Sequence, residues 1–210
     1  QALGQDYLAA GVLDRAERVF LDLIQFGNEN NLVLSSLMRL YQREKDWRKA
    51  IQIARRLKSR GLGKMSIEIA QFYCELAEEE IDKSQFGEAQ KYIKQALSIN
   101  KACERAVIQS ARILLIEERV NDAIRLMEAE PGQHLAYWVL RLGVLAKAYA
   151  KLNSHADFVD FLSRCLATKP MLLSQVDVII AGEDIELYRS LLASIKLDIV
   201  DSDGPSPVGL

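Results

Sequence analysis

The sequence predicts an all-α protein in which pairs of antiparallel helices repeat along the chain. Anchor residues, small in the first four copies, recur at intervals of 34, 39, 34 and 35 residues, at Ala16, Ala50, Ala89, Ala123 and Phe158. Apolar residues follow helical spacing, whereas strand-like alternation and Asn-Gly or Asp-Gly hairpin turns are essentially absent. Because the period near 34 residues is sustained through five copies, it indicates a solenoid of stacked helix pairs.

The first copy shows the pattern most clearly. Leu3 and Gly4 are followed by Tyr7, and then by Ala16 and Phe20. A Leu-Gly pair, an aromatic residue three positions after the glycine and a small residue nine positions further on are typical of a tetratricopeptide (TPR) repeat. The small residue allows two antiparallel helices to approach closely, while the large residues fill the space between them.

Later copies follow the same frame with local departures. The 39-residue step contains a longer loop at residues 59–64, which has two glycines, and Phe158 replaces a small residue in the fifth copy, where we expect a splayed helix pair. We therefore expect an α-solenoid of about five helix pairs, at residues 1–29, 30–63, 64–100, 101–130 and 131–170.

The repeat pattern fades after Pro170. Met171–Ala181 and Asp184–Ile195 still show amphipathic spacing, so residues 171–199 are predicted to form a degenerate capping pair that closes the stack. Residues 200–210 are rich in turn-forming residues and poor in packing residues. This last segment is predicted to be a flexible tail.

The composition excludes several classes of protein. Half of the 210 residues are hydrophobic and 27% are charged, which suits a chain with a substantial core. The balance of 27 basic and 29 acidic residues excludes nucleic-acid binding by bulk charge, and no apolar run approaches the roughly 20 residues of a membrane-spanning helix. Three widely spaced cysteines predict free thiols in a reducing, cytoplasmic compartment. Since the sequence starts without Met, we expect a piece of a longer protein.

Motifs of catalytic chemistry are missing from the sequence. It contains no HExxH, GxSxG, glycine-rich phosphate loop or CxxC, and its two histidines, His134 and His155, stand at predicted helix starts. We therefore expect no enzymatic activity, no metal and no cofactor in this chain. The competing hypothesis is an enzyme or metalloprotein whose chemistry lies in segments outside this sequence.

One segment departs from the overall charge balance. Between Arg39 and Lys64 there are ten basic residues and only two acidic ones, Glu44 and Asp46. A solvated helix face explains such an excess, and so does an anionic membrane surface or an acidic partner protein. Nucleic acid is not expected, because no aromatic residues are interleaved for base stacking.

In a stack of helix pairs the first helix of each pair lines a common inner surface that binds peptides or partner helices. Positions that face this surface follow from the repeat frame, and most of them are basic. We therefore expect a groove selective for an acidic or carboxylate-bearing segment. The predicted groove residues are Gln5, Arg39, Gln42, Arg43, Cys74, Glu78, Arg105, Arg112, Lys147 and Lys151.

Three segments resemble a known family. The run Asp6–Gly11, the following Leu13–Glu17 and above all Ile67–Ala77 are similar to repeats of the lipopolysaccharide assembly protein B (LapB) family. The resemblance implies a bacterial inner-membrane protein with an amino-terminal anchor, cytoplasmic TPR repeats and a rubredoxin-type metal knuckle. It further implies an adaptor that promotes degradation of the deacetylase LpxC by the protease FtsH, under control of a lipopolysaccharide-sensing membrane partner.

This chain departs from the family pattern at both ends, since it has neither the anchor nor the paired CxxC motifs of the knuckle. Metal-dependent functions are therefore not carried over to it. The alternative to the LapB-like function is a generic TPR co-chaperone or assembly scaffold unrelated to lipopolysaccharide. The sequence leaves the oligomeric state open.

Overall fold

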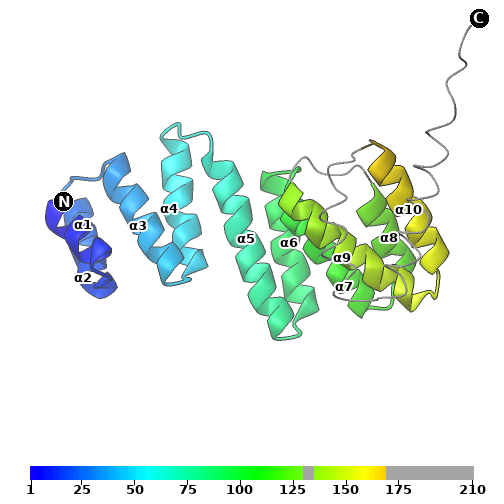
Figure 1. Cartoon of the computed structure of the whole chain (residues 1–210). Coiled ribbons are helices and arrows are strands. Elements are labelled where there is room, and N and C mark those ends of the chain that lie inside the picture. Colours follow the sequence, from blue (N-terminus) through cyan, green and yellow to red (C-terminus); the bar gives the residue numbers. More distant parts are fainter. Residues whose placement is uncertain (130–134, 169–210) are drawn as a thin grey trace, which may run out of the picture. The chain divides into compact units, whose positions relative to one another are not determined.

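A computed structural model describes residues 1–129 and 135–168, and the predicted capping helices and tail lie outside these residues. The described part is all-α, which confirms the predicted class of TPR-type helix pairs (Figure 1). It contains ten helices, and no strand is assigned within it. The helices are α1 (Ala2–Ala9), α2 (Leu13–Gln25), α3 (Asn31–Arg43), α4 (Trp47–Ser59), α5 (Met65–Asp82), α6 (Phe86–Ile99), α7 (Glu104–Ile116), α8 (Val120–Glu128), α9 (Leu135–Lys151) and α10 (His155–Thr168).

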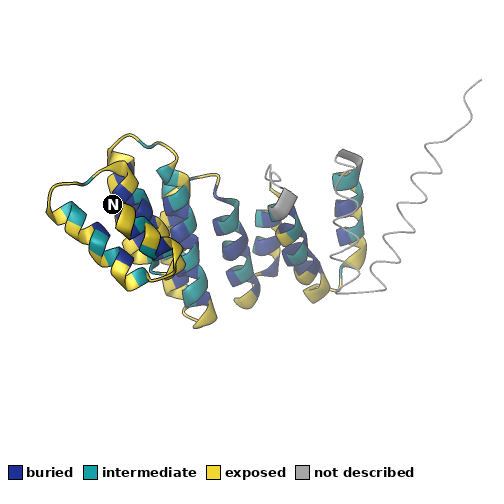
Figure 2. Cartoon of the chain, turned by 60° about the vertical axis from the view of Figure 1, so that its left-hand side comes forward, coloured by how far each residue is buried: buried dark blue, intermediate teal, exposed yellow. Residues whose placement is uncertain are grey.

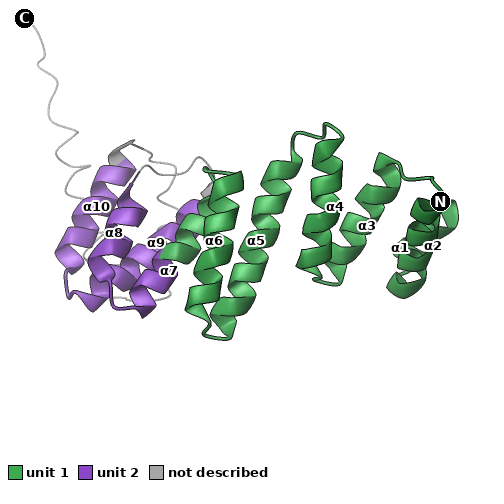
Figure 3. Ribbon diagram, turned by 180° about the vertical axis from the view of Figure 1, so that it is seen from behind, with its two compact units in different colours: residues 1–110 green, residues 111–210 purple. Residues whose placement is uncertain are grey.

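The chain divides into two compact units (Figure 3). Unit 1 spans Gln1–Ser110 and contains α1 to α6 with the first half of α7, and unit 2 spans Ala111–Leu210. In unit 1 each of α1 to α5 packs against the next helix in the chain, and in unit 2 α9 packs against both α8 and α10. Buried residues lie where neighbouring helices face one another, and exposed residues lie on the outer sides (Figure 2).

The anchor positions of the repeat lie in the core. Ala16, Ala50, Ala89 and Ala123 are fully buried, and Phe158 is 1% exposed. The methyl groups of these alanines allow close helix packing, which is the role that the repeat frame assigns to them. Phe158 instead packs its ring against Tyr149, with ring centroids 5.6 Å apart.

The turn inside each helix pair follows the same period. Five residues before each anchor the backbone has a positive φ, between 53° and 76°. The next residue in each turn donates its N–H to a carbonyl five positions earlier, as Asp46 does to Tyr41 at 2.9 Å. This arrangement ends the first helix and reverses the chain in every pair. The positive-φ residues are Gly11, Lys45, Ser84, Glu118 and Asn153.

Candidate partner-binding surface

The predicted groove residues of unit 1 lie on the first helix of each pair. Gln5 is on α1, and Arg39, Gln42 and Arg43 are on α3. Helix α3 begins at a defined residue because the Asn30 side chain accepts the N–H of Val33 at 3.0 Å. The three α3 residues share one face of the helix, since positions three and four apart are neighbours on its surface.

Two of these four side chains also join α1 to α3. The Gln5 amide donates to the Ser36 hydroxyl at 2.5 Å, and the Arg43 guanidinium donates to the backbone carbonyl of Leu8. Arg39, by contrast, is exposed and makes no hydrogen bond or ion pair with any residue that the structure describes. Of the two arginines on this face of α3, Arg39 is therefore the one whose guanidinium is available to the carboxylate of a partner protein.

Polar contacts also join α5 to α7. Arg105 forms an ion pair with Glu75 at 2.5 Å. The buried Gln109 amide donates to the backbone carbonyl of Cys74 at 2.8 Å and to the Glu78 carboxylate at 2.7 Å. Sequence reasoning did not select Glu75 or Gln109, because their contacts lie about 30 residues away along the chain. Inside unit 1, Arg105 is therefore paired with a carboxylate, and one oxygen of Glu78 is occupied by an amide donor.

Cys74 does not lie on the candidate surface. Its side chain is fully buried, and its sulfur lies 3.6 Å from that of the buried Cys103. The thiol of Cys74 lowers the pKa of Cys103 by hydrogen bonding, with help from the backbone N–H groups of Ala106 and Arg105 at the start of α7. The pKa of Cys74 is raised by the same hydrogen bond and by burial. The sequence gives both thiols but no sign that they meet.

The remaining predicted residues belong to unit 2. Arg112 is half-buried on α7, and Lys147 is exposed on α9. Lys151 at the end of α9 forms an ion pair with Glu118 at 2.8 Å and donates to the backbone carbonyl of Leu115 at 3.3 Å. Since these three side chains are in a separate unit, the candidate surface in unit 1 is limited to α1, α3, α5 and the first half of α7.

Most cations of the basic segment have partners inside unit 1. Arg56 and Arg60 both bind the Glu29 carboxylate, and Lys49 binds Glu17 at 3.3 Å. Arg48 and Arg55 donate to tyrosine hydroxyls, at 2.7 and 2.8 Å. The local charge excess is thus smaller than the sequence suggests. Four basic residues keep exposed side chains with no partner among the described residues, namely Arg39, Lys45, Lys58 and Lys64.

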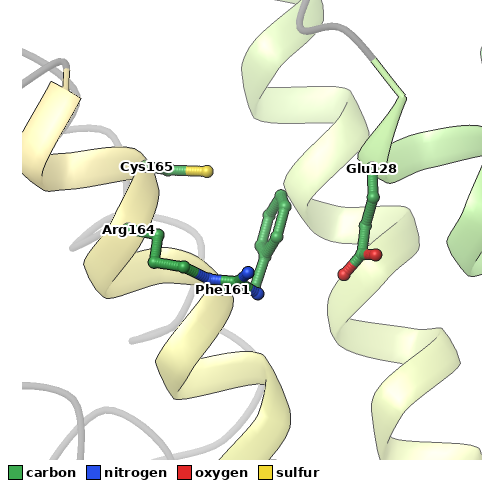
Figure 4. Close-up of a pocket in the computed structure, with 4 residues that line it drawn as sticks. All are labelled: Glu128, Phe161, Arg164 and Cys165. Carbon is green, nitrogen blue, oxygen red and sulfur yellow. The ribbon is translucent and has the colours of Figure 1, made fainter.

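A pocket in unit 2 contains none of the predicted residues (Figure 4). Phe161, Arg164 and Cys165 from α10 and Glu128 from the end of α8 line it. The Glu128 carboxylate accepts a hydrogen bond from the Tyr149 hydroxyl at 2.6 Å, so it is already engaged by the fold. The pocket therefore adds nothing to the candidate surface.

Residues 1–129 and 135–168 contain neither a metal-binding cluster nor a membrane-spanning helix. No group of three or more His, Cys, Asp or Glu side chains there could hold a metal ion. None of the helices in that part combines the length and the apolarity that crossing a membrane requires. His155 is exposed at the start of α10, and His134 lies outside the described residues.

Comparison with known proteins gives matches to one set of curated relatives. Lipopolysaccharide assembly protein B of Escherichia coli strain K12 is 31% identical over 166 residues, which cover 79% of this chain and 43% of the relative. The protein of the same name from Haemophilus influenzae is 29% identical over 164 residues, covering 78% of this chain and 41% of the relative. The chain is therefore related to lipopolysaccharide assembly protein B. This confirms the resemblance that its repeats carry.

The chain spans about two fifths of the length of the lipopolysaccharide assembly protein B sequences that it matches. No family model matches it. Among solved structures, a thermophilic TPR protein of Thermus thermophilus aligns over 92% of this chain and 96% of its own, with 16% identity and a TM-score of 0.38.

Proposed function

We propose that this chain is a non-enzymatic protein-binding scaffold and serves as the cytoplasmic repeat region of a LapB-like regulator of lipopolysaccharide synthesis. The relation to proteins named lipopolysaccharide assembly protein B supports this assignment. In the proposed role the repeats bring LpxC to the membrane protease FtsH. The whole protein is anchored at the inner membrane and is regulated by a lipopolysaccharide-sensing membrane partner.

The observation that carries the binding function is the polar face of α3. Arg39 is exposed there without a partner among the described residues, and it lies one helical turn from Gln42 and Arg43. A guanidinium can hold a carboxylate with two parallel hydrogen bonds, and the neighbouring amide adds a donor and an acceptor. The face therefore suits an extended acidic segment of a partner protein.

The binding test compares two charge reversals. Arg39→Glu changes the proposed contact, whereas Lys94→Glu changes an exposed lysine on α6, a second helix of its pair, that has no partner among the described residues. Titration with purified LpxC should show weaker binding and a smaller salt dependence for Arg39→Glu, with Lys94→Glu close to wild type. Equal affinities for both variants would refute a role for the α3 face.

The biological test measures LpxC abundance in the host bacterium. Depletion of the protein should raise the amount of LpxC, because its degradation would slow. Re-expression of the Lys94→Glu form should restore the normal amount, and the Arg39→Glu form should not. Unchanged LpxC on depletion would favour the generic co-chaperone or assembly scaffold.

A further inference from the structure

Two connections of unit 1 lie together on one edge. The α2–α3 link and the α4–α5 loop are neighbours there, because helices α2 to α5 alternate in direction (Figures 1 and 3). Arg60 ties them together, donating to the Glu29 backbone carbonyl at 3.0 Å and to its carboxylate at 2.7 Å. We define the loop edge as residues 26–32 and 56–67.

Three bulky apolar side chains are exposed on the loop edge. Phe26, at the end of α2, is 79% exposed, Leu32 in the first turn of α3 is 53% exposed, and Ile67 in the first turn of α5 is 54% exposed. They come from three separate segments that the fold brings to the same edge. Large apolar side chains gathered on an exposed surface often mark an interaction site.

The loop edge that carries these apolar side chains is also rich in basic residues. The loop edge contains four basic residues, Arg56, Lys58, Arg60 and Lys64, and one acidic residue, Glu29. Glu29 is neutralised by Arg56 and Arg60. Lys58 and Lys64 are exposed and without partners in the described part of the chain. The loop edge therefore has a net positive charge that the fold does not compensate.

The opposite edge of unit 1 differs in charge. It contains the α3–α4 and α5–α6 turns, where Lys45 stands between Glu44 and Asp46, and Lys83 follows Asp82 and forms an ion pair with Glu80 at 3.0 Å. Basic residues at these turns are matched by acidic neighbours. Net positive charge is therefore a property of the loop edge and not of inter-helix connections in general.

We propose that the loop edge docks on the surface of a lipid bilayer rich in anionic lipid. Phe26, Leu32 and Ile67 would enter the interfacial layer, while Lys58 and Lys64 contact headgroup phosphates through their flexible side chains. A bilayer fits better than an acidic protein, because the core of a protein interface is depleted in lysine, whereas the apolar residues here stand among lysines.

The test is flotation of the 210-residue chain with vesicles. Vesicles of phosphatidylglycerol and phosphatidylethanolamine should bind the protein, and vesicles of phosphatidylcholine alone should not. The double variant Lys58→Gln/Lys64→Gln should lower partition about 25-fold, since each basic residue near an anionic surface contributes about a factor of five. The matched control, Lys45→Gln/Lys83→Gln on the opposite edge, should partition like wild type.

Apolar insertion has a separate readout. Phe26→Ser should reduce partition about tenfold, and the fluorescence of a Phe26→Trp variant should shift to the blue on anionic vesicles relative to wild type. Failure to bind anionic vesicles, or equal losses in the loop-edge and control variants, would overturn the proposal. Loss with the lysine pair but none with Phe26→Ser would overturn docking through apolar insertion. None of these outcomes bears on the Arg39 test with LpxC.

Discussion

Gly4 offers the sharpest test of the packing inside unit 1. It lies in α1 facing α2, where a methyl group added to its Cα would stand 2.8 Å from Phe20 Cε1, 3.0 Å from Phe20 Cζ and 3.1 Å from Val19 Cγ1. Phe20 is fully buried, so its ring has little room to withdraw. The substitution to examine is Gly4→Ala.

Two effects of opposite sign set its magnitude. Alanine favours a helix over glycine by about 1 kcal/mol, and this would stabilise α1. Overpacking a filled core costs about 2 kcal/mol, because the ring and the helix must shift. Since the contact distance falls below 3.0 Å and the ring is enclosed, we expect the packing cost to dominate. Gly4→Ala should therefore lower the free energy of unfolding by about 1 kcal/mol.

Urea denaturation, with hydrogen exchange of the α1 amides, measures the effect. The matched control is Gly87→Ala in the first turn of α6, where the added methyl group would meet no atom within 4 Å, so stability should rise by about 0.5 kcal/mol. In a Phe20→Leu background the Gly4→Ala change should turn favourable, because the ring atoms that it meets are gone. Equal gains for Gly4→Ala and Gly87→Ala in the wild-type background would refute the packing argument.

Three further predictions concern a turn, a buried hydroxyl and the thiols. Ser84→Gly should stabilise the fold by about 0.5 kcal/mol, because a left-handed conformation costs serine more than glycine, and thermal unfolding at pH 7 would measure the gain. The pKa of Tyr41 is raised above its ordinary value of 10 by burial and by its hydrogen bond to Glu17. The stabilisation that the Tyr41 hydroxyl contributes is therefore complete below pH 10 and is lost progressively as pH rises above 10. In urea titrations the difference in unfolding free energy between wild type and Tyr41→Phe should shrink over that range. In native protein iodoacetamide should modify the half-buried Cys165 before Cys74 and Cys103, as read by peptide mass, and equal rates would contradict the burial of that pair.

Sequence reasoning succeeded where a residue's role depends on its own repeat. The buried anchor at Ala50 and the positive-φ turn residue at Lys45 have counterparts in every repeat, because each helix pair needs the same close packing and the same chain reversal. A repeat frame fixes which face a residue occupies but not the identity of the side chain opposite. For this reason the frame predicted the class of fold and could not predict the contact between the Cys74 and Cys103 sulfurs.

The candidate surface was predicted less completely for the same reason. The frame placed Arg39, Arg43 and Cys74 on a common inner surface. In the structure Arg43 donates to the carbonyl of Leu8, 35 residues earlier. Cys74 is fully buried, and its backbone carbonyl accepts a hydrogen bond from Gln109, 35 residues later. Hydrogen bonds between neighbouring repeats thus decide which polar side chains remain available. That choice depends on pairs of residues far apart in the sequence, which periodicity alone does not specify.

The distribution of the remaining cations separates the two proposed interactions. Among the cations of the basic segment that have no partner in the described residues, Arg39 lies on α3, Lys45 at the α3–α4 turn, and Lys58 and Lys64 on the loop edge. Because Arg39 lies about two helical turns along α3 from Leu32 of the loop edge, a protein partner and a membrane need not compete. Arg39→Glu should lose LpxC binding and keep vesicle binding, whereas Lys58→Gln/Lys64→Gln should show the reverse. If either variant lost both, a single shared surface would explain the data better, and the division of the basic segment into two functions would be wrong.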